Sequence, residues 1–494
     1  MGDDREFDRM IEEELTQLPL SDQEIEEITP WKRAMRRIVW GIGLLTVTLN
    51  FWCLNYLLPA VGVVLLWLGF RALRRENKWF AACWIISLYR AADLFVRLVA
   101  SATLWRQGGD VPAWMWLTLA IPLAQYLCLW QGIRAVRRKA GQPDQAGAAG
   151  ALAAFYVLLC ALGLVGVEGW LFGLPVLAAY ICILRNLAKL PTLLDGAGYE
   201  VHAAPGWLSD RTVWIGWTAA LVVCIPLAAL LFGRYPMEWA PVEAEEQAGL
   251  EEIRDNLLEL GFPRAVLDDL SAEDLADCAG ALRVNWEVDE EPMNDGYEVS
   301  QTEGGITHVW TEYDVYELKL TSVAVELPDN RWKVIHHFLW LAAPKVRGTE
   351  SLQLWIYGIT PENYFVSEDQ YSLWLSGRLL WDRDNVTYTG DYYSLGQEDY
   401  LSYSFFGTEA RRDVFAEFSL PLGGENCRGY VAYTAQRSDW DKILFDSWMN
   451  YTHQRSWFNY PAGTAKEYRQ GNIFSSRVFK TVQTQLLTQL SAES

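Results

Sequence analysis

The sequence predicts an α-helical polytopic membrane bundle of about seven spans, followed by a small helical module and a mainly antiparallel, sandwich-like β domain. Long apolar runs in the first half are separated by Lys and Arg clusters, whereas parts of the second half alternate with period two. The formal net charge is −9 for residues 1–30, +11 for 31–234 and −23 for 235–494. A basic membrane block therefore lies between two acidic soluble parts.

Residues 1–30 form the predicted acidic arm, with an amphipathic helix. Its apolar stripe is Phe7, Met10, Ile11 and Leu15, with three- and four-residue steps. One interpretation is a solvated acidic helix near the membrane. The other is a docking helix for a cytoplasmic protein, because an apolar stripe without its own core has to be buried against something.

The first apolar run, residues 38–70, decides the topology. A bilayer core of about 30 Å needs about 20 apolar residues per helix, so this run is long for one span and short for two. It is either one tilted helix or a tight hairpin turning near Asn55–Pro59. Cation clusters lie at both ends, and the positive-inside rule places both ends on the same side. We therefore predict the hairpin.

Seven spans in membrane lipid follow from this choice, at about residues 38–54, 57–72, 79–105, 114–136, 150–167, 169–187 and 212–232. Seven crossings of a cell membrane with a cytoplasmic N-terminus place residues 235–494 outside the cytoplasm. Most cations then fall in loops assigned to the inside, which agrees with the positive-inside rule. The acidic start does not resemble a cleavable signal peptide.

One group of charges lies within a predicted span. Arg90, Asp93 and Arg97 share one helical face because they are three and four residues apart. Ionisable groups inside a span often mark proton or ion sites. The alternative is a structural ion pair of Asp93 with Arg90 or Arg97. We favour the structural interpretation because the other spans contain few polar residues.

Two cysteines, Cys278 and Cys427, fall in the part predicted to be outside the cytoplasm. An oxidising compartment permits a disulfide between them, and two buried free thiols are the alternative. The other six cysteines lie one to a span and are expected to be packing residues.

Residues 235–283 are predicted to form a helical linker. One helix is expected over 243–260, ended by Gly261, a second begins at Pro263, and a third has a Ser271–Asp274 capping box. Residues 284–436 are predicted to be β-rich. In Trp332–Leu341 both faces are largely apolar, as in a central strand, and His336 and His337 point to opposite faces. Residues 437–494 are predicted to form helices packed on the sheet, at 440–457 and 475–490.

Function is weakly constrained by these patterns. We find no nucleophile, metal or nucleotide motif, and therefore expect neither an enzyme nor a bound cofactor. The acidity argues against nucleic-acid partners. Eleven of the 25 Trp and 17 of the 23 Tyr lie in residues 235–494, which suits recognition of a sugar, peptide or protein.

Three functional hypotheses remain. The first is a sensor or regulator that connects the outer domain with a cytoplasmic partner. The second is a transporter or a transporter accessory subunit, and the third is a passive envelope scaffold. The order of acidic arm, spans and outer domain resembles that of membrane regulators that bind sigma factors, in layout and without a shared motif.

Overall fold

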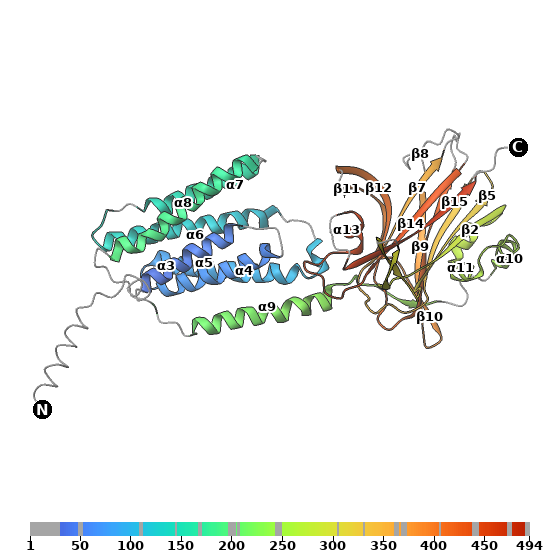
Figure 1. The fold of residues 1–494 in the computed structure, drawn as a ribbon, viewed down its shortest axis with the longest axis horizontal. Helices are drawn as coiled ribbons and strands as arrows, with labels where there is room; N and C mark the ends of the chain where they lie inside the picture. The colour runs from blue at the N-terminus through green and yellow to red at the C-terminus, as the bar shows by residue number, and fades with distance from the viewer. Residues whose placement is uncertain are drawn as a thin grey trace, which may run out of the picture. The chain divides into compact units, whose positions relative to one another are not determined.

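The computed structural model forms two compact units (Figure 1), residues 1–100 with 107–225 and residues 101–106 with 226–494. The residues it describes are 30–47, 53–107, 112–143, 146–165, 170–195, 204, 208–242, 249–303, 306–329, 331–359, 365–366, 373–404, 407–436, 444–471 and 477–489. Helices dominate the first unit, and strands dominate the second.

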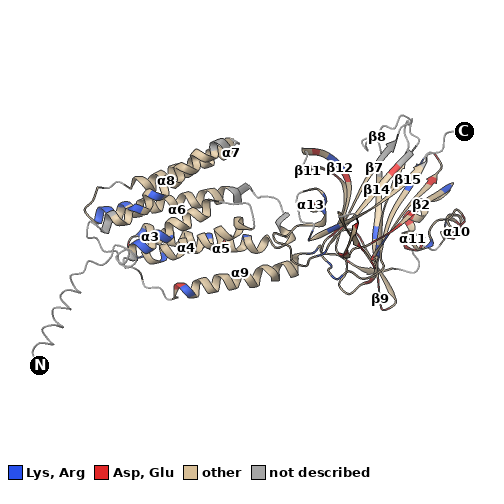
Figure 2. Ribbon diagram, in the orientation of Figure 1, with Lys and Arg blue, Asp and Glu red and all other residues tan. Residues whose placement is uncertain are grey.

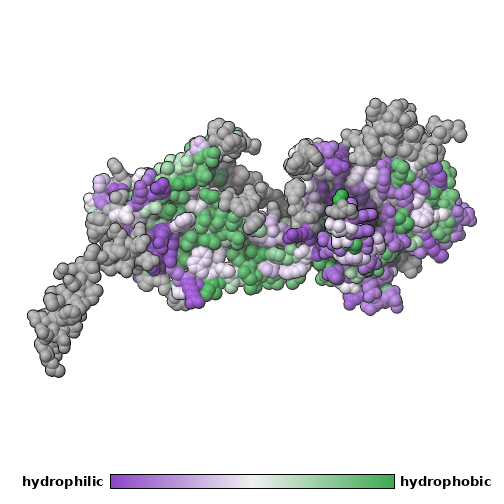
Figure 3. Space-filling model, viewed as in Figure 1, coloured by the Kyte–Doolittle hydropathy of each residue, from purple (hydrophilic) through white to green (hydrophobic). Residues whose placement is uncertain are grey.

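Seven α-helices run between residues 30 and 232 of the described chain. They are α3 (Pro30–Thr46), α4 (Leu54–Leu73), α5 (Lys78–Ala100), α6 (Pro112–Lys139), α7 (Gly147–Val165), α8 (Trp170–Asp195) and α9 (Asp210–Phe232), with the 3-10 helix η1 (Leu104–Gln107) after α5. Five segments of the described chain are long and apolar enough to cross a membrane, namely Leu54–Leu73, Lys78–Ala100, Gly147–Val165, Gly173–Thr192 and Asp210–Phe232. The exposed surface of the helices is largely hydrophobic (Figure 3) and includes Ile215, Val222 and Leu230. These features are compatible with a membrane location.

Helices α3 and α4 pack closely as an antiparallel pair. A Cβ added at Gly41 would lie 2.8 Å from the Gly62 carbonyl oxygen, and one at Gly69 would lie 2.9 Å from that of Ala34. Glycine is needed here because the two backbones approach within the space of a side chain. Helix α3 ends at Thr46 and α4 begins at Leu54, so the segment Asn55–Pro59, where the sequence predicts a turn, lies inside α4, which accommodates Pro59.

Lys and Arg gather at one end of the helical unit (Figure 2). Arg37 Nη1 lies 2.7 Å from Asp210 Oδ2, and Arg71 pairs with the other oxygen of the same carboxylate. At that end Lys139 Nζ also lies 2.9 Å from Glu76 Oε1. The start of α3 and the end of α4 are thus joined through the first residue of α9.

The second unit is built on two antiparallel sheets. The seven-stranded sheet has the order β1-β10-β9-β13-β6-β5-β2, and the six-stranded sheet has the order β11-β12-β7-β14-β15 with β8 paired to β7. The strands of the first sheet are β1 (Ala240–Pro241), β2 (Arg283–Glu291), β5 (Leu318–Leu327), β6 (Arg331–Trp340), β9 (Leu373–Arg383), β10 (Val386–Gly390) and β13 (Glu425–Gln436). Those of the second are β7 (Glu350–Ile359), β8 (Phe365–Val366), β11 (Ser394–Ser404), β12 (Gly407–Phe418), β14 (Leu444–Gln454) and β15 (Phe479–Gln489). A separate hairpin pairs β3 (Tyr297–Glu303) with β4 (Ile306–Glu312).

The two sheets share one hydrophobic core. Phe338 of β6 stacks on Phe418 of β12 and meets Tyr451 of β14 edge-on, with ring centroids 5.4 and 5.0 Å apart. Side chains of both faces of β6 are buried, as the sequence predicts for Trp332–Leu341. Val334 and Phe338 lie in the core between the sheets, and Ile335 lies in a second core on the other face. The domain is therefore a mainly antiparallel sandwich.

Three short helices cover the other face of the seven-stranded sheet. These are α10 (Glu251–Glu259), α11 (Arg264–Asp269) and α12 (Ala272–Ala276). Leu267, Leu270 and Leu275 pack on Val325 and Ile335 of the sheet. The helices thus form a layer of the β domain and not a separate linker, because their shared apolar face is buried on the sheet. The Ser271 hydroxyl accepts a hydrogen bond from the Asp274 N–H at 3.1 Å and thereby caps the N-terminus of α12.

The predicted C-terminal helices are wrong. Residues 444–454 and 479–489 are β14 and β15, paired with each other over their whole lengths. On β15, Val482, Thr484 and Leu486 are buried and alternate with more exposed residues, which is a strand period. The described helix of this region is α13 (Ala465–Arg469), with a capping box at Thr464.

Candidate functional site

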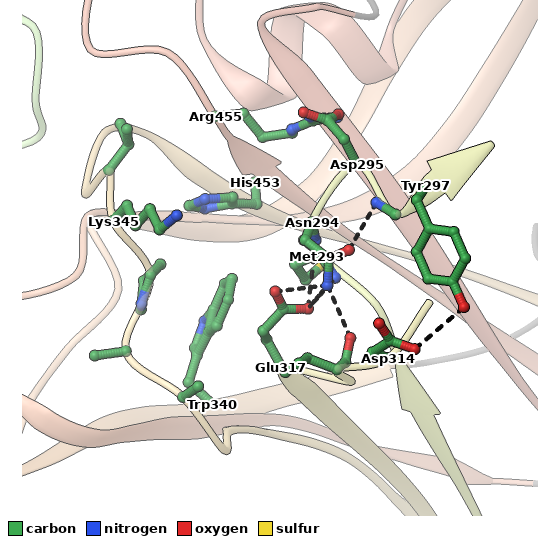
Figure 4. A pocket seen from close by; sticks show the side chains of 16 residues that line it. Met293, Asn294, Asp295, Tyr297, Asp314, Glu317, Trp340, Lys345, His453 and Arg455 are labelled. Carbon is green, nitrogen blue, oxygen red and sulfur yellow. Dashed lines mark hydrogen bonds and ion pairs between the residues drawn. The ribbon is translucent and has the colours of Figure 1, made fainter. Parts of the chain in front are cut away.

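A pocket of about 610 Å³ opens at one end of the sandwich (Figure 4). Its walls are the loops that join β2 to β3, β4 to β5 and β6 to β7. Trp340, the last residue of β6, and His453, near the end of β14, complete it. The pocket thus lies where side chains of the inter-sheet core reach the surface, a frequent position for ligands in β folds.

A buried carboxylate orients His453. The register of β7 and β14 places Glu350 opposite His453, and His453 Nδ1 lies 2.7 Å from Glu350 Oε1. Glu350 is fully buried, and burial raises the pKa of its carboxyl group, which the neighbouring His453 opposes. Because Nδ1–H donates to the carboxylate, Nε2 is the ring nitrogen left to face the pocket. The Trp340 ring packs edge-on against the imidazole, 4.9 Å between centroids.

Two acids of the pocket are engaged by the loops around them. Glu317 accepts the backbone N–H of Met293 at 2.7 Å and the Asn294 Nδ2 amide at 2.8 Å. Asp295 forms an ion pair with Arg455, drawn at the top of Figure 4. These contacts hold the β2–β3 loop against the ends of β5 and β14.

Lys345 and Tyr297 lie on different walls of the pocket. The Lys345 side chain is exposed, and no residue of the described chain forms an ion pair with it. In Figure 4 its amine points toward the His453 ring. The Tyr297 hydroxyl donates to Asp314 Oδ1 at 3.3 Å. The site therefore offers an amine, an imidazole nitrogen and an aromatic wall, which suits binding of a small polar molecule.

The two adjacent histidines of β6 have separate structural roles. His336 lies in the inter-sheet core, with Ser322 Oγ 2.7 Å from Nδ1 and Ser447 Oγ 2.7 Å from Nε2. His337 faces the helical layer, where its Nε2 lies 2.9 Å from Asp269 Oδ2. They point to opposite faces, as expected. Among the described residues no group of three His, Cys, Asp or Glu side chains could hold a metal ion.

The three charged residues of the predicted third span, Arg90, Asp93 and Arg97, lie together on α5. Arg97 Nε is 3.0 Å from Asp93 Oδ2, whereas Arg90 Nη1 donates to Gln125 Oε1 of α6 at 2.5 Å. All three charged side chains line a groove of about 240 Å³ beside α4 and α6. Gln125 is buried and also donates to Ser87 Oγ at 2.7 Å, so the polar residues of α5 and α6 form one network.

Cys278 and Cys427 are both free thiols and both buried. Cys278 belongs to the core under α10–α12, and Cys427 belongs to the core between the sheets. The disulfide considered from the sequence is therefore absent from the structure, because the two side chains lie in cores on opposite faces of the seven-stranded sheet. The proposed docking residues Phe7, Met10, Ile11 and Leu15 lie outside the described residues.

Sequence reasoning missed the pairing of Glu350 with His453. The reason is that the sequence predicts a helix over residues 440–457, and a helix places a different set of residues on one face than a strand does. As a strand, the segment places Ser447, Met449, Tyr451 and His453 on one side, and the first three are a polar residue and two core residues. The alternation of core-facing and outward-facing residues along this segment was the signal that could have shown His453 on the core-facing side of a strand.

Comparisons with known proteins give no functional assignment. No family model matches the chain, and no curated protein matches it. One solved structure, of the AvmM protein that catalyses macrocyclization in alchivemycin A biosynthesis, covers 34% of this chain and 84% of its own, at 11% identity and a TM-score of 0.17. A heparinase III gene product covers 96% of this chain and 76% of its own, at 10% identity and a TM-score of 0.15. Neither likeness carries an argument about fold or function.

Proposed function

We propose that the chain is a multi-pass membrane sensor or regulator whose β domain binds a ligand. The observation that carries the proposal is the pocket of about 610 Å³ containing His453 and Lys345. Such volumes are typical of small-molecule sites, and the pocket is lined by both apolar and polar side chains. In this proposal the acidic arm, residues 1–30, binds a cytoplasmic protein and responds to occupancy of the β domain.

The proposed topology has seven membrane crossings, a cytoplasmic N-terminus and an extracytoplasmic β domain. The gathering of Lys and Arg at one end of the helical unit supports it, because positively charged ends of spans stay in the cytoplasm. The packing of α3 against α4 also supports a hairpin whose two basic ends lie on the same side.

The proposal is tested in cells with the full chain and two variants. Crosslinking through residues 1–30 should recover a specific cytoplasmic protein, and deletion of those residues should abolish recovery while membrane insertion is retained. Lys345→Gln should change how much partner is recovered, whereas Lys319→Gln, at a partly exposed cation of β5 outside the pocket, should not. Recovery of no partner by the wild-type chain would count against a regulatory role.

A second candidate function, a transporter or its accessory subunit, is favoured by the groove beside α5. Arg90, Asp93 and Arg97 all line it, although charged side chains in a span are costly. Under this hypothesis, replacing both Arg90 and Asp93 with Ala abolishes flux of a solute. If neither this double variant nor the arm deletion has a phenotype, a passive envelope scaffold is the remaining hypothesis.

A further inference from the structure

The acidic side chains of the β-domain pocket interact with neighbouring protein groups, whereas Lys345 and His453 Nε2 are available to a ligand. Glu317 accepts a hydrogen bond from the β2–β3 loop, and Asp295 forms an ion pair with Arg455. Asp314 accepts a hydrogen bond from Tyr297. By contrast, no hydrogen bond or ion pair within the described chain engages the Lys345 amine or His453 Nε2. The groups left for a ligand are therefore an amine and an imidazole nitrogen.

We infer that the pocket binds a small molecule bearing a carboxylate or phosphate, with this oxyanion held between Lys345 Nζ and His453 Nε2. The inference rests on the proposed function only in taking the pocket as a ligand site. An ammonium donates up to three hydrogen bonds and a protonated imidazole donates at both nitrogens, so both suit an oxyanion.

Glu350 makes His453 a suitable donor. Its Oε1 holds the imidazole by Nδ1, which fixes the ring orientation, while its Oε2 is buried and has no hydrogen-bond partner in the described structure. An ionised Glu350 attracts a positive charge on the imidazole, because the Coulomb attraction is large where water is excluded. With an oxyanion bound, the ring carries a proton on each nitrogen and donates from Nε2.

The walls of the pocket define the rest of the ligand. Trp340, Pro344 and Val346 provide an apolar side, and the volume of about 610 Å³ accommodates a molecule of modest size. We therefore expect the oxyanion to be attached to a compact body that packs on the Trp340 side. A neutral ligand that donates a hydroxyl to an unprotonated Nε2 is the competing occupant.

Other charged groups lie around the Glu350–His453 pair. Lys345, Glu317 and the Asp295–Arg455 pair face His453 from the loops and β14, and Lys480 is its register neighbour on β15. Arg234 lies near Glu350 and also favours its ionised form.

The test is calorimetric titration of the purified full-length protein in detergent with three probes of similar size. Phenyl phosphate and benzoate represent the two oxyanion sources, and benzamide is the neutral match. We expect at least one of the two anions to bind about tenfold or more tightly than benzamide. Lys345→Gln should weaken it by about 10- to 100-fold, the usual range for a charge-assisted hydrogen bond. Lys319→Gln should leave the affinity unchanged.

Glu350→Gln gives a second readout that a merely structural role would not produce. This variant keeps an acceptor for Nδ1 but removes the negative charge, so the affinity for the two anions should fall relative to that for benzamide. Equal binding of benzamide and both anions, no binding of any probe, or unchanged affinity in Lys345→Gln would each overturn the inference. Anion binding without any partner at residues 1–30 would instead leave the ligand class standing and refute the regulatory function.

Discussion

Acidification from pH 7 to pH 5 should destabilise the β domain through His336. This side chain is fully buried between the sheets, and burial lowers its pKa from 6.5 to about 3. In the unfolded chain the imidazole takes up a proton below pH 6.5, whereas in the folded domain it stays neutral until about pH 3. The unfolded state therefore binds more protons over this interval, and stability falls as the pH falls.

The size of the effect follows from the pKa difference. Each unit corresponds to about 1.4 kcal/mol, so the free energy of unfolding should drop by about 2 kcal/mol between pH 7 and pH 5. The remaining loss continues down to about pH 3. The Ser322 and Ser447 hydroxyls satisfy both ring nitrogens of the neutral imidazole but supply no negative charge that would favour its protonated form.

Hydrogen exchange of the full-length protein in detergent, read on peptides that contain β6 and corrected for intrinsic rates, measures this loss. His336→Gln removes the titrating group, so its exchange free energy should change by about 2 kcal/mol less over the same interval. His308→Gln, on the exposed β4 strand, should behave as the wild type. Equal pH dependence of the wild type and His336→Gln would refute the reasoning.

Three further predictions concern packing, charge and topology. Lys333→Met should destabilise the helical layer by about 3–5 kcal/mol in exchange measurements, because it leaves the buried Asp274 carboxylate without its cation, whereas Lys319→Met, at a partly exposed ion pair, should cost at most about 1 kcal/mol. Gly41→Leu should lower the thermal stability of the bundle in detergent by about 1–3 kcal/mol or prevent packing of the hairpin, whereas Gly163→Leu, with open space around its Cβ, should not. A protease-cleavable tag at Gly423 should be cut from outside intact cells, and protection of the tag there with cutting only after lysis would contradict the proposed topology.

Local signals in the sequence were sufficient for many elements. The alternation of Trp332–Leu341 marks β6, and the turn residues Asp384 and Asn385, both with positive φ, separate β9 from β10. Ser271 caps α12 as its spacing indicates. These features depend on residues close together in the chain, so no knowledge of distant partners was needed to predict them.

The identity of β14 depended on distant partners. Its two faces do not differ clearly in polarity, because side chains of both faces are buried, Met449 and Tyr451 on one face and Asp446 and Asn450 on the other. Strands β7 and β15 pair with its two edges. Backbone pairing and burial then outweigh the local preference that favoured a helix. The same pairing brings His453 to Glu350, about a hundred residues away in the chain.

Charge and hydropathy are properties of short segments, so the sequence alone divides the chain into an acidic arm, a basic apolar block and an acidic β-rich part. Alternation is inherent in a strand, so the sequence also predicts that His336 and His337 face opposite ways. The fold was needed to place Cys278 and Cys427 in different cores, to pair Glu350 with His453 and to bring His453 and Lys345 to one pocket. Such meetings are set by strand register and sheet packing, which join residues whose separation along the chain carries no information about their separation in space.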